Sequence, residues 1–203
     1  MILMNTESTP NPQTSGSHHH HVFPWWAGYL LANPLRRLWH DPATILAPLV
    51  REGMTILEPG PGLGFFTIEL ARRVGAGGRV IALDVQPQML AGLQRRVAKA
   101  GLADRLETRQ VPTSGLGVEG LAGSVDFALV FAMAHEVPDQ ARFFREVAAS
   151  LKAGGKILLA EPAGRVTADE FAATRRLAGD AGLEVAGRPD IRRSRTTLFA
   201  KGR

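Results

Sequence analysis

The sequence predicts an α/β fold with a mostly parallel sheet and helices on both of its faces. Strand-like and helix-like runs alternate from residue 41 to the C-terminus, as in chains that wind strands and helices in turn. Most of the strand-like runs are apolar, which is typical of strands covered on both faces. The predicted parallel strands are Met54–Glu58, Arg79–Asp84, Arg105–Gln110, Ser124–Phe131 and Lys156–Glu161.

The intervening helices carry recognisable end signals. One helix begins near Pro87, which suits a first helical turn, and ends at Gly101. Another has Asp139 as its predicted N-cap and closes at the pair Gly154–Gly155. A last helix is expected from about Thr167 to Ala181.

Two strand-like runs follow the last helix. They are Leu183–Gly187 and Thr196–Ala200, with Arg188–Pro189 between them. The closeness of the two runs predicts an antiparallel hairpin at the edge of the sheet.

The composition indicates one globular domain with a short appendage. The chain has 203 residues, and 24 Lys and Arg against 19 Asp and Glu give a net charge of +5. Residues 1–17 lack the pattern of a signal peptide, and no apolar stretch is long enough to span a membrane. Cysteine is absent, so disulfides and thiolate sites are excluded. A cytoplasmic location is therefore expected.

The basic charge has two readings. It could serve an acidic or nucleic-acid partner, or it could be an arginine-rich bias spread over solvated helix faces. The basic residues are scattered, with one cluster at Arg192–Arg195. Binding of nucleic acid is therefore the less favoured reading.

The N-terminal part divides into two expected segments ahead of the domain at 41–203. Residues 1–21 read as a disordered lead-in with a histidine tract, and residues 22–40 form an aromatic helical arm. Trp25, Trp26 and Tyr29 would make the arm a lid with apolar walls over a substrate pocket. The alternatives are a helix docked on the sheet, or a patch for a membrane surface or a dimer.

A glycine-rich loop follows the first strand. The segment Glu58–Gly64 places an acidic residue before three glycines at alternating positions, and Asp84 ends the next strand. Such a unit is typical of nucleoside binding, with glycines where the backbone approaches the ligand and a carboxylate for the ribose about 20 residues later. A dinucleotide fingerprint would need glycine at Phe65 or Thr67, so a nicotinamide oxidoreductase is less favoured.

This order, Glu58-x-Gly60-x-Gly62-x-Gly64, resembles the E/D-x-G-x-G-x-G motif of class I S-adenosylmethionine-dependent methyltransferases. The turn at Leu151–Leu158 is similar to the family's "LkpGG" turn before its fifth strand. The resemblance covers roughly residues 41–203 and is nearest in style to small-molecule enzymes of ubiquinone and menaquinone biosynthesis. It implies a Rossmann-like sheet of seven strands and S-adenosyl-L-methionine as cofactor.

By this resemblance, the glycines pass the methionine moiety, Glu58 holds the loop or reaches the cofactor's amino group through water, and Asp84 binds the ribose. An alternative for Asp84 is a helix N-cap. The family's usual acidic residue after strand 3 is missing, and Gln110 or Thr113 would have to replace it. The expected cofactor-binding residues are Glu58, Gly60, Gly62, Gly64, Asp84, Val85, Gln86, Met89, Gln110 and Phe131.

The expected acceptor side lies after strands 4 and 5. His135 and Glu136 resemble the family's "LHHxxD"-like segment, and Glu161 ends strand 5. Methyl transfer needs a base only when the acceptor loses a proton, and His135 is the candidate. Glu136 and Glu161 complete the predicted catalytic group. The alternative for His135 is packing or capping at the strand end.

No metal is predicted. The tract His18–His21 could be a polar run, a tag remnant or a cluster over the active site with His40 and His135, but no ligand spacing supports a metal. Arsenite methyltransferases of related fold rely on cysteines, so arsenite is not the expected acceptor.

The sequence therefore predicts a methyltransferase that acts on a small molecule, as a monomer or homodimer. The Asn/Asp-Pro-Pro-aromatic motif of enzymes that methylate nucleic-acid amino groups is absent. Two alternatives stay open, which are an RNA-directed methyltransferase and a non-catalytic protein that binds S-adenosylmethionine.

Overall fold

The computed structural model describes residues 40–202. The predicted lead-in 1–21 and nearly all of the predicted arm 22–40 lie outside the described residues, and with them the expected lid residues Trp25, Trp26 and Tyr29. The described part begins at His40 and includes all the predicted strands.

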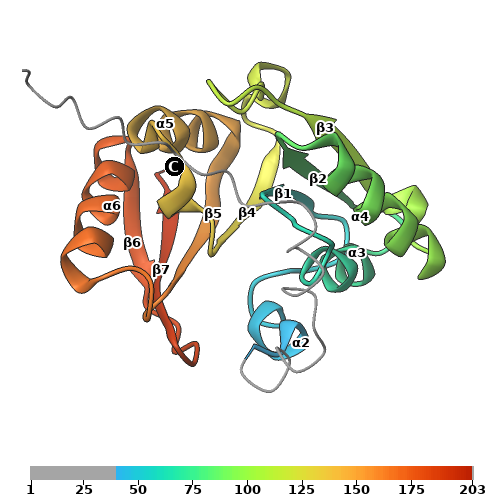
Figure 1. Ribbon diagram of the computed structural model, residues 1–203, viewed down its shortest axis with the longest axis horizontal. Helices are drawn as coiled ribbons and strands as arrows, with labels where there is room; N and C mark the ends of the chain where they lie inside the picture. Colours follow the sequence, from blue (N-terminus) through green and yellow to red (C-terminus); the bar gives the residue numbers. More distant parts are fainter. Residues whose placement is uncertain (1–39, 203) are drawn as a thin grey trace, which may run out of the picture.

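A seven-stranded sheet with the order β3-β2-β1-β4-β5-β7-β6 forms the centre of the described chain (Figure 1). The strands from β3 to β5 pair in parallel, and β7 runs antiparallel to both β5 and β6. The predicted fold class is therefore confirmed, including the terminal hairpin. The bounds are β1 Thr55–Pro59, β2 Arg79–Asp84, β3 Leu106–Gln110, β4 Val125–Phe131, β5 Leu151–Pro162, β6 Leu183–Gly187 and β7 Ser194–Lys201.

Helices cover both faces of the sheet. The α-helices are α2 Pro42–Leu46, α3 Thr67–Val74, α4 Pro87–Lys99, α5 Gln140–Ser150 and α6 Ala168–Asp180, and a short 3₁₀ helix, η5, spans Ala134–Glu136. On one face, α2, α3 and α4 pack on residues such as Ile56, whereas on the other α5 and α6 pack on residues such as Leu57. The alternation of neighbouring strand residues between two buried layers explains the continuous apolar runs.

The predicted helix starts agree with the structure, whereas the predicted end of α5 at Gly154–Gly155 is wrong, because α5 ends at Ser150 and the glycine pair lies within β5. The Asp139 side chain accepts a hydrogen bond from the Arg142 backbone N–H and caps α5. At α6, Thr167 and Glu170 form a reciprocal capping box, which satisfies free backbone donors of the first turn. Pro87 occupies the first turn of α4.

Strand β5 begins earlier than its predicted start at Lys156. Leu151 already pairs with Val125 of β4, and the register then jumps so that Lys156 pairs with Phe127. The residues between them loop out, and a Cβ on Gly155 would lie 2.9 Å from the Lys152 carbonyl oxygen. The glycine pair thus permits a bulge within the strand. The apolar run that begins at Lys156 does not reveal that the strand starts before this bulge.

The strand order creates the place for a ligand. From β1, the chain crosses to β2 on one side, whereas β4 lies on its other side. Crossovers that leave in opposite directions open a crevice at the carboxyl ends of the strands. Glu58 lies near the end of β1, and Gly60 and the rest of the glycine loop follow β1 at this crevice.

We expect Gly64→Ala to destabilise the protein. Gly64 has φ +85°, and a Cβ there would lie 2.6 Å from Cδ1 of Leu93, which is fully buried. The cost should be about 1–3 kcal/mol of unfolding free energy, measured by urea denaturation. The matched control is Gly179→Ala in α6, where a Cβ meets nothing within 4 Å. Equal stability of the two variants would contradict this account of Gly64.

Candidate active site

The glycine loop leaves bare backbone beside a cavity. Gly60 donates its backbone N–H to the Leu83 carbonyl at 2.8 Å, which fastens the start of the loop to β2. Gly62 has φ +56°, and a Cβ there would meet no atom nearer than the Met89 methyl carbon at 3.9 Å. A side chain at Gly62 would therefore enter open space in front of the loop.

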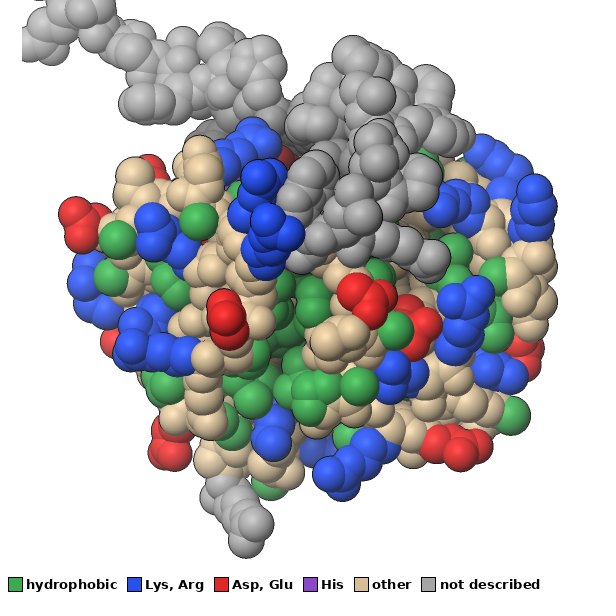
Figure 2. Space-filling view, turned by 90° about the horizontal axis from the view of Figure 1, so that it is seen from below, with side chains coloured by type: hydrophobic (Ala, Val, Ile, Leu, Met, Phe, Trp, Pro, Cys, Tyr) green, Lys and Arg blue, Asp and Glu red, His purple; other side chains and the backbone are tan. Residues whose placement is uncertain are grey.

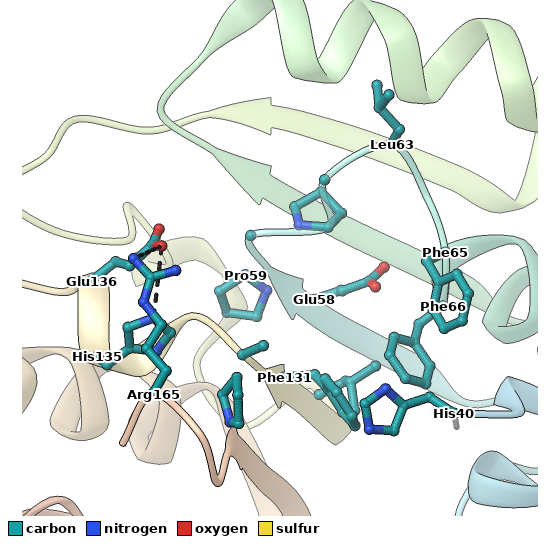
Figure 3. Close-up of a pocket in the computed structure, with 16 residues that line it drawn as sticks. His40, Glu58, Pro59, Leu63, Phe65, Phe66, Phe131, His135, Glu136 and Arg165 are labelled. Atoms are coloured by element: carbon teal, nitrogen blue, oxygen red, sulfur yellow. Dashed lines mark ion pairs between the residues drawn. The ribbon is translucent and has the colours of Figure 1, made fainter. Parts of the chain in front are cut away.

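The cavity has a volume of about 290 Å³ and lies at the carboxyl ends of β1, β4 and β5 (Figure 3). Its size suits a small organic ligand. The loop forms one side, and the segments after β4 and β5 form another. The lining residues are His40, Glu58, Pro59, Gly60, Pro61, Gly62, Leu63, Phe65, Phe66, Leu129, Phe131, Ala132, His135, Glu136, Pro162 and Arg165.

Aromatic rings make one wall of this cavity. The rings of Phe66 and Phe131 lie 4.4 Å apart, and Phe65 meets Phe66 edge-on at 5.1 Å. The His40 ring meets Phe131 edge-on at 5.2 Å, and its Nε2 lies 2.9 Å from the Arg192 carbonyl oxygen. Figure 2 shows hydrophobic side chains gathered near the middle of one face, with charged side chains of both signs around them.

Glu58 is a buried acid at the end of β1. Its side chain is oriented by the Thr67 hydroxyl, which donates to Oε2 at 2.6 Å from the first turn of α3. Burial raises the pKa of the Glu58 carboxyl to about 8, although the Thr67 hydrogen bond acts in the opposite direction. The carboxyl is therefore largely protonated at neutral pH.

Asp84 ends β2 at the other side of the loop. Its Oδ1 accepts a hydrogen bond from the Gln86 backbone N–H at 2.9 Å. Burial raises the pKa of the Asp84 carboxyl, and hydrogen bonds from the Gln86 and Val85 backbone lower it in part. The N-cap of α4 is Gln86, so the alternative reading of Asp84 as that N-cap is wrong.

The remaining predicted residues of the cofactor site gather beside Asp84. Gln110 is the register partner of Asp84 in β3, and its Nε2 donates to the Val85 carbonyl oxygen at 3.4 Å. Met89 is buried in the first turns of α4, within reach of Gly62. Asp84, Val85, Gln86, Met89 and Gln110 therefore share one rim next to the cavity, although none of them lines it.

Gly64 has a different environment from the other two loop glycines. It does not line the cavity but lies against Leu93 of α4. Leu63 similarly packs against Gly92, where a Cβ would lie 2.7 Å from its Cδ2. These close contacts hold the loop onto α4.

His135 and Glu161 form a hydrogen-bonded pair at the cavity wall. Nδ1 of His135 lies 2.5 Å from Oε2 of Glu161, whose side chain is 1% exposed. The other oxygen of Glu161 accepts the Ala134 backbone N–H at 2.8 Å. After β4 the chain turns through Ala132, at φ +57°, into η5, which brings His135 back toward β5. The carboxylate thus fixes the orientation of the imidazole.

Glu136 stands between two cationic or ionisable groups. Its Oε1 lies 3.7 Å from Nε2 of His135 and 3.9 Å from Nη2 of Arg165 (Figure 3). Both distances exceed that of a hydrogen bond. Nε2 of His135 is buried and has no hydrogen-bond partner within residues 40–202.

Several lining residues were not predicted from the sequence. Arg165 follows β5 at the strand end where ligands bind, and this position was its only signal in the sequence. Phe65 and Phe66 follow the glycine loop directly and look like ordinary helix residues there. The sequence suggests His40 only as a metal ligand, whereas the His40 ring packs on Phe131.

No group of His, Asp and Glu in residues 40–202 is arranged to hold a metal ion, and the tract His18–His21 lies outside that range. No helix in the same range is long and apolar enough to cross a membrane.

Comparison with known proteins identifies the family. A family model described as "Methyltransferase domain" matches residues 57–159. The ubiquinone/menaquinone biosynthesis C-methyltransferase UbiE of Idiomarina loihiensis is 29% identical over 132 residues, 65% of this chain and 51% of that protein. The arsenite methyltransferase of Halobacterium salinarum is 29% identical over 109 residues, 54% of this chain and 27% of that protein.

A solved structure supports the same fold over a longer range. A SAM dependent methyltransferase from Aquifex aeolicus has a TM-score of 0.78 and 24% identity, covering 88% of this chain and 98% of that one. The chain spans about half the length of the curated UbiE relatives that it matches. It belongs to the methyltransferase-domain family as a class I S-adenosylmethionine-dependent methyltransferase, and S-adenosylmethionine is the cofactor of this family.

Proposed function

We propose that this chain transfers a methyl group from S-adenosylmethionine to a small-molecule acceptor, and that His135 takes a proton from that acceptor. The observation that carries the proposal is the His135–Glu161 pair at the wall of a cavity in front of the glycine loop. The quinone-biosynthesis C-methyltransferases among the relatives support a small acceptor. Their own acceptor is not carried over, since this chain matches only half of their length.

The residues present fit the cofactor. Gly60 and Gly62 offer backbone without side chains at the cavity, and the space before Gly62 is open. We propose that Asp84 holds the ribose hydroxyls and that Glu58 lies near the methionine end. Val85, Gln86, Met89 and Gln110 would hold the adenine. When bound, S-adenosylmethionine supplies a methyl group already activated by its sulfonium centre.

The Glu161 carboxylate prepares His135 to act as a base. Because Oε2 of Glu161 lies beside Nδ1, the proton of the neutral imidazole stays on Nδ1 and Nε2 keeps its lone pair. The acceptor's proton would move to Nε2, and the resulting imidazolium would face Glu161 at Nδ1 and Glu136 at Nε2. Such a pairing stabilises the charge that develops on the ring.

The aromatic wall favours a small acceptor over a nucleic acid. Phe65, Phe66 and Phe131 offer apolar surface that excludes water and holds an organic body close to the base. The pair of His135 and Glu161 also argues against a non-catalytic binding protein, because cofactor binding alone needs no oriented base.

We expect Asp84→Ala to weaken binding of S-adenosylhomocysteine by at least about tenfold, because charge-assisted hydrogen bonds to the ribose are lost. Isothermal titration calorimetry measures the affinity. The control is Asp104→Ala, an exposed aspartate that follows α4. An unchanged affinity in Asp84→Ala would remove the ribose assignment.

We expect His135→Ala to lower turnover by about 100-fold or more while the affinity for S-adenosylhomocysteine stays nearly unchanged, since a general base acts only in the chemical step. Release of S-adenosylhomocysteine across an acceptor library reports turnover. Glu161→Gln should also lower turnover and alter its pH profile, because the neutral amide cannot stabilise the imidazolium in the same way. Wild-type turnover in His135→Ala would leave His135 with a packing role only.

We expect the unfolding free energy of the protein without cofactor to fall as pH rises from about 5 to about 8. The folded state raises the pKa of Glu58 from 4.5 to about 8, so it keeps a proton that the unfolded chain loses in this window. Glu58→Gln should reduce the fall measured by urea denaturation and leave the contribution of Asp84. Glu184→Gln, an exposed control in β6, should keep the wild-type slope. Identical slopes in wild type and Glu58→Gln would contradict the buried, protonated state.

A further inference from the structure

We propose that Arg165 binds a carboxylate of the acceptor, so that the acceptor is a small organic anion. The inference rests on the proposed methyl transfer and specifies its substrate class. It follows from the guanidinium at the cavity wall, from the way its turn is fastened and from its position relative to His135.

The Arg165 guanidinium has hydrogen-bond donors that no group within residues 40–202 accepts. It lines the cavity, and its side chain is 58% exposed. Its nearest carboxylate oxygen, Oε1 of Glu136, lies 3.9 Å away, and within residues 40–202 the guanidinium donates no hydrogen bond. A guanidinium presents a rigid fork of N–H groups that matches a carboxylate in a bidentate manner. A ligand carboxylate would therefore make contacts that Glu136 does not make.

The turn that carries Arg165 is held in place. Its backbone N–H donates to the Pro162 carbonyl at 3.0 Å, and the Ala163 N–H donates to the Arg193 carbonyl at 2.9 Å. The Arg195 side chain also donates its Nε–H to a carbonyl of the same turn at 2.9 Å. These hydrogen bonds fasten the turn to β5 and β7, so they hold the backbone at Arg165 in place.

The same strand end positions both the cation and the base. Glu161, which orients His135, is in the last residues of β5, and Arg165 follows in the next turn. Figure 3 shows Arg165, His135 and Glu136 together, with Phe131 on another side of the cavity. An acceptor with its carboxylate on Arg165 would extend past His135 toward the aromatic wall. Its shape would be an apolar body with a carboxylate and a separate proton-bearing group.

The acidic side chains at the cavity would still allow one anionic ligand to bind. Glu161 is engaged with His135, and Glu58 is held by Thr67 with a raised pKa. Glu136 is thus the carboxylate that competes for Arg165. Because a ligand carboxylate must approach this like charge, replacing Glu136 by a neutral residue should strengthen anion binding, whereas replacing Arg165 should weaken it.

The test compares acids with their neutral amides. The probes are 2-, 3- and 4-hydroxybenzoate and the three matching hydroxybenzamides, titrated by calorimetry into the full chain saturated with S-adenosylhomocysteine. In the wild type, at least one acid should bind about tenfold or more tightly than its amide, as charge-assisted hydrogen bonds predict. Arg165→Gln should remove this preference and leave the amide affinity unchanged.

Two further variants make the result specific. Arg176→Gln, an exposed position on α6, changes the net charge equally and should keep the preference for the acid. Glu136→Gln should strengthen binding of the acid and not of the amide. The inference is overturned if no acid binds more tightly than its amide, if Arg165→Gln keeps the preference, or if Arg176→Gln removes it as well.

These outcomes are separate from a failure of the proposed function. The proposed function would be contradicted if the wild type did not bind S-adenosylhomocysteine. It would also be contradicted if the protein methylated no acceptor of a library that includes neutral and anionic molecules. Transfer to neutral acceptors alone, with S-adenosylhomocysteine bound normally, would support the methyltransferase and overturn the role of Arg165.

Discussion

The turn from β1 into α3 is the constraint on which the rest of the site depends. It must reverse the chain within the crevice between β2 and β4 and still keep its backbone open to a ligand. The hydrogen bond from Thr67 to Glu58 closes the base of this turn at 2.6 Å, and Gly64 packs it against Leu93. Both anchors are buried, and the open side of the loop faces the cavity.

The fold was largely predictable because its signals are local. Apolar runs located β1, β2 and β4 to within one residue, and cap residues such as Asp139 and Thr167 marked helix starts. The early start of β5 was missed, because the pairing of Leu151 with Val125 depends on a register set in space. The glycines of that segment signalled a turn, but they did not reveal that the turn lies inside a paired strand.

The site was predictable where its residues are neighbours in sequence. The glycine loop and Asp84 form a pattern with a known spacing, whereas Arg165 belongs to a turn without a motif. His135 and Glu161 were both expected on the rim, but their contact spans 26 residues and requires the parallel pairing of β4 with β5. The roles of the individual residues stay predictions, although their placement around one crevice follows from the strand order.

The cavity has backbone of the glycine loop on one side and side chains from the segments after β4 and β5 on the other. On the proposed donor side, Gly60 and Gly62 present backbone to the cavity, so substitutions at these two positions disturb the turn itself. The acceptor side consists of side chains such as His135 and Arg165, which project from segments after β4 and β5. A change at the exposed Arg165 leaves the buried core and the glycine loop untouched. With Arg165 and Asp84 in their proposed roles, the charge preference for the acceptor would change independently of methyl-donor binding, because the two would depend on different strand ends of one sheet.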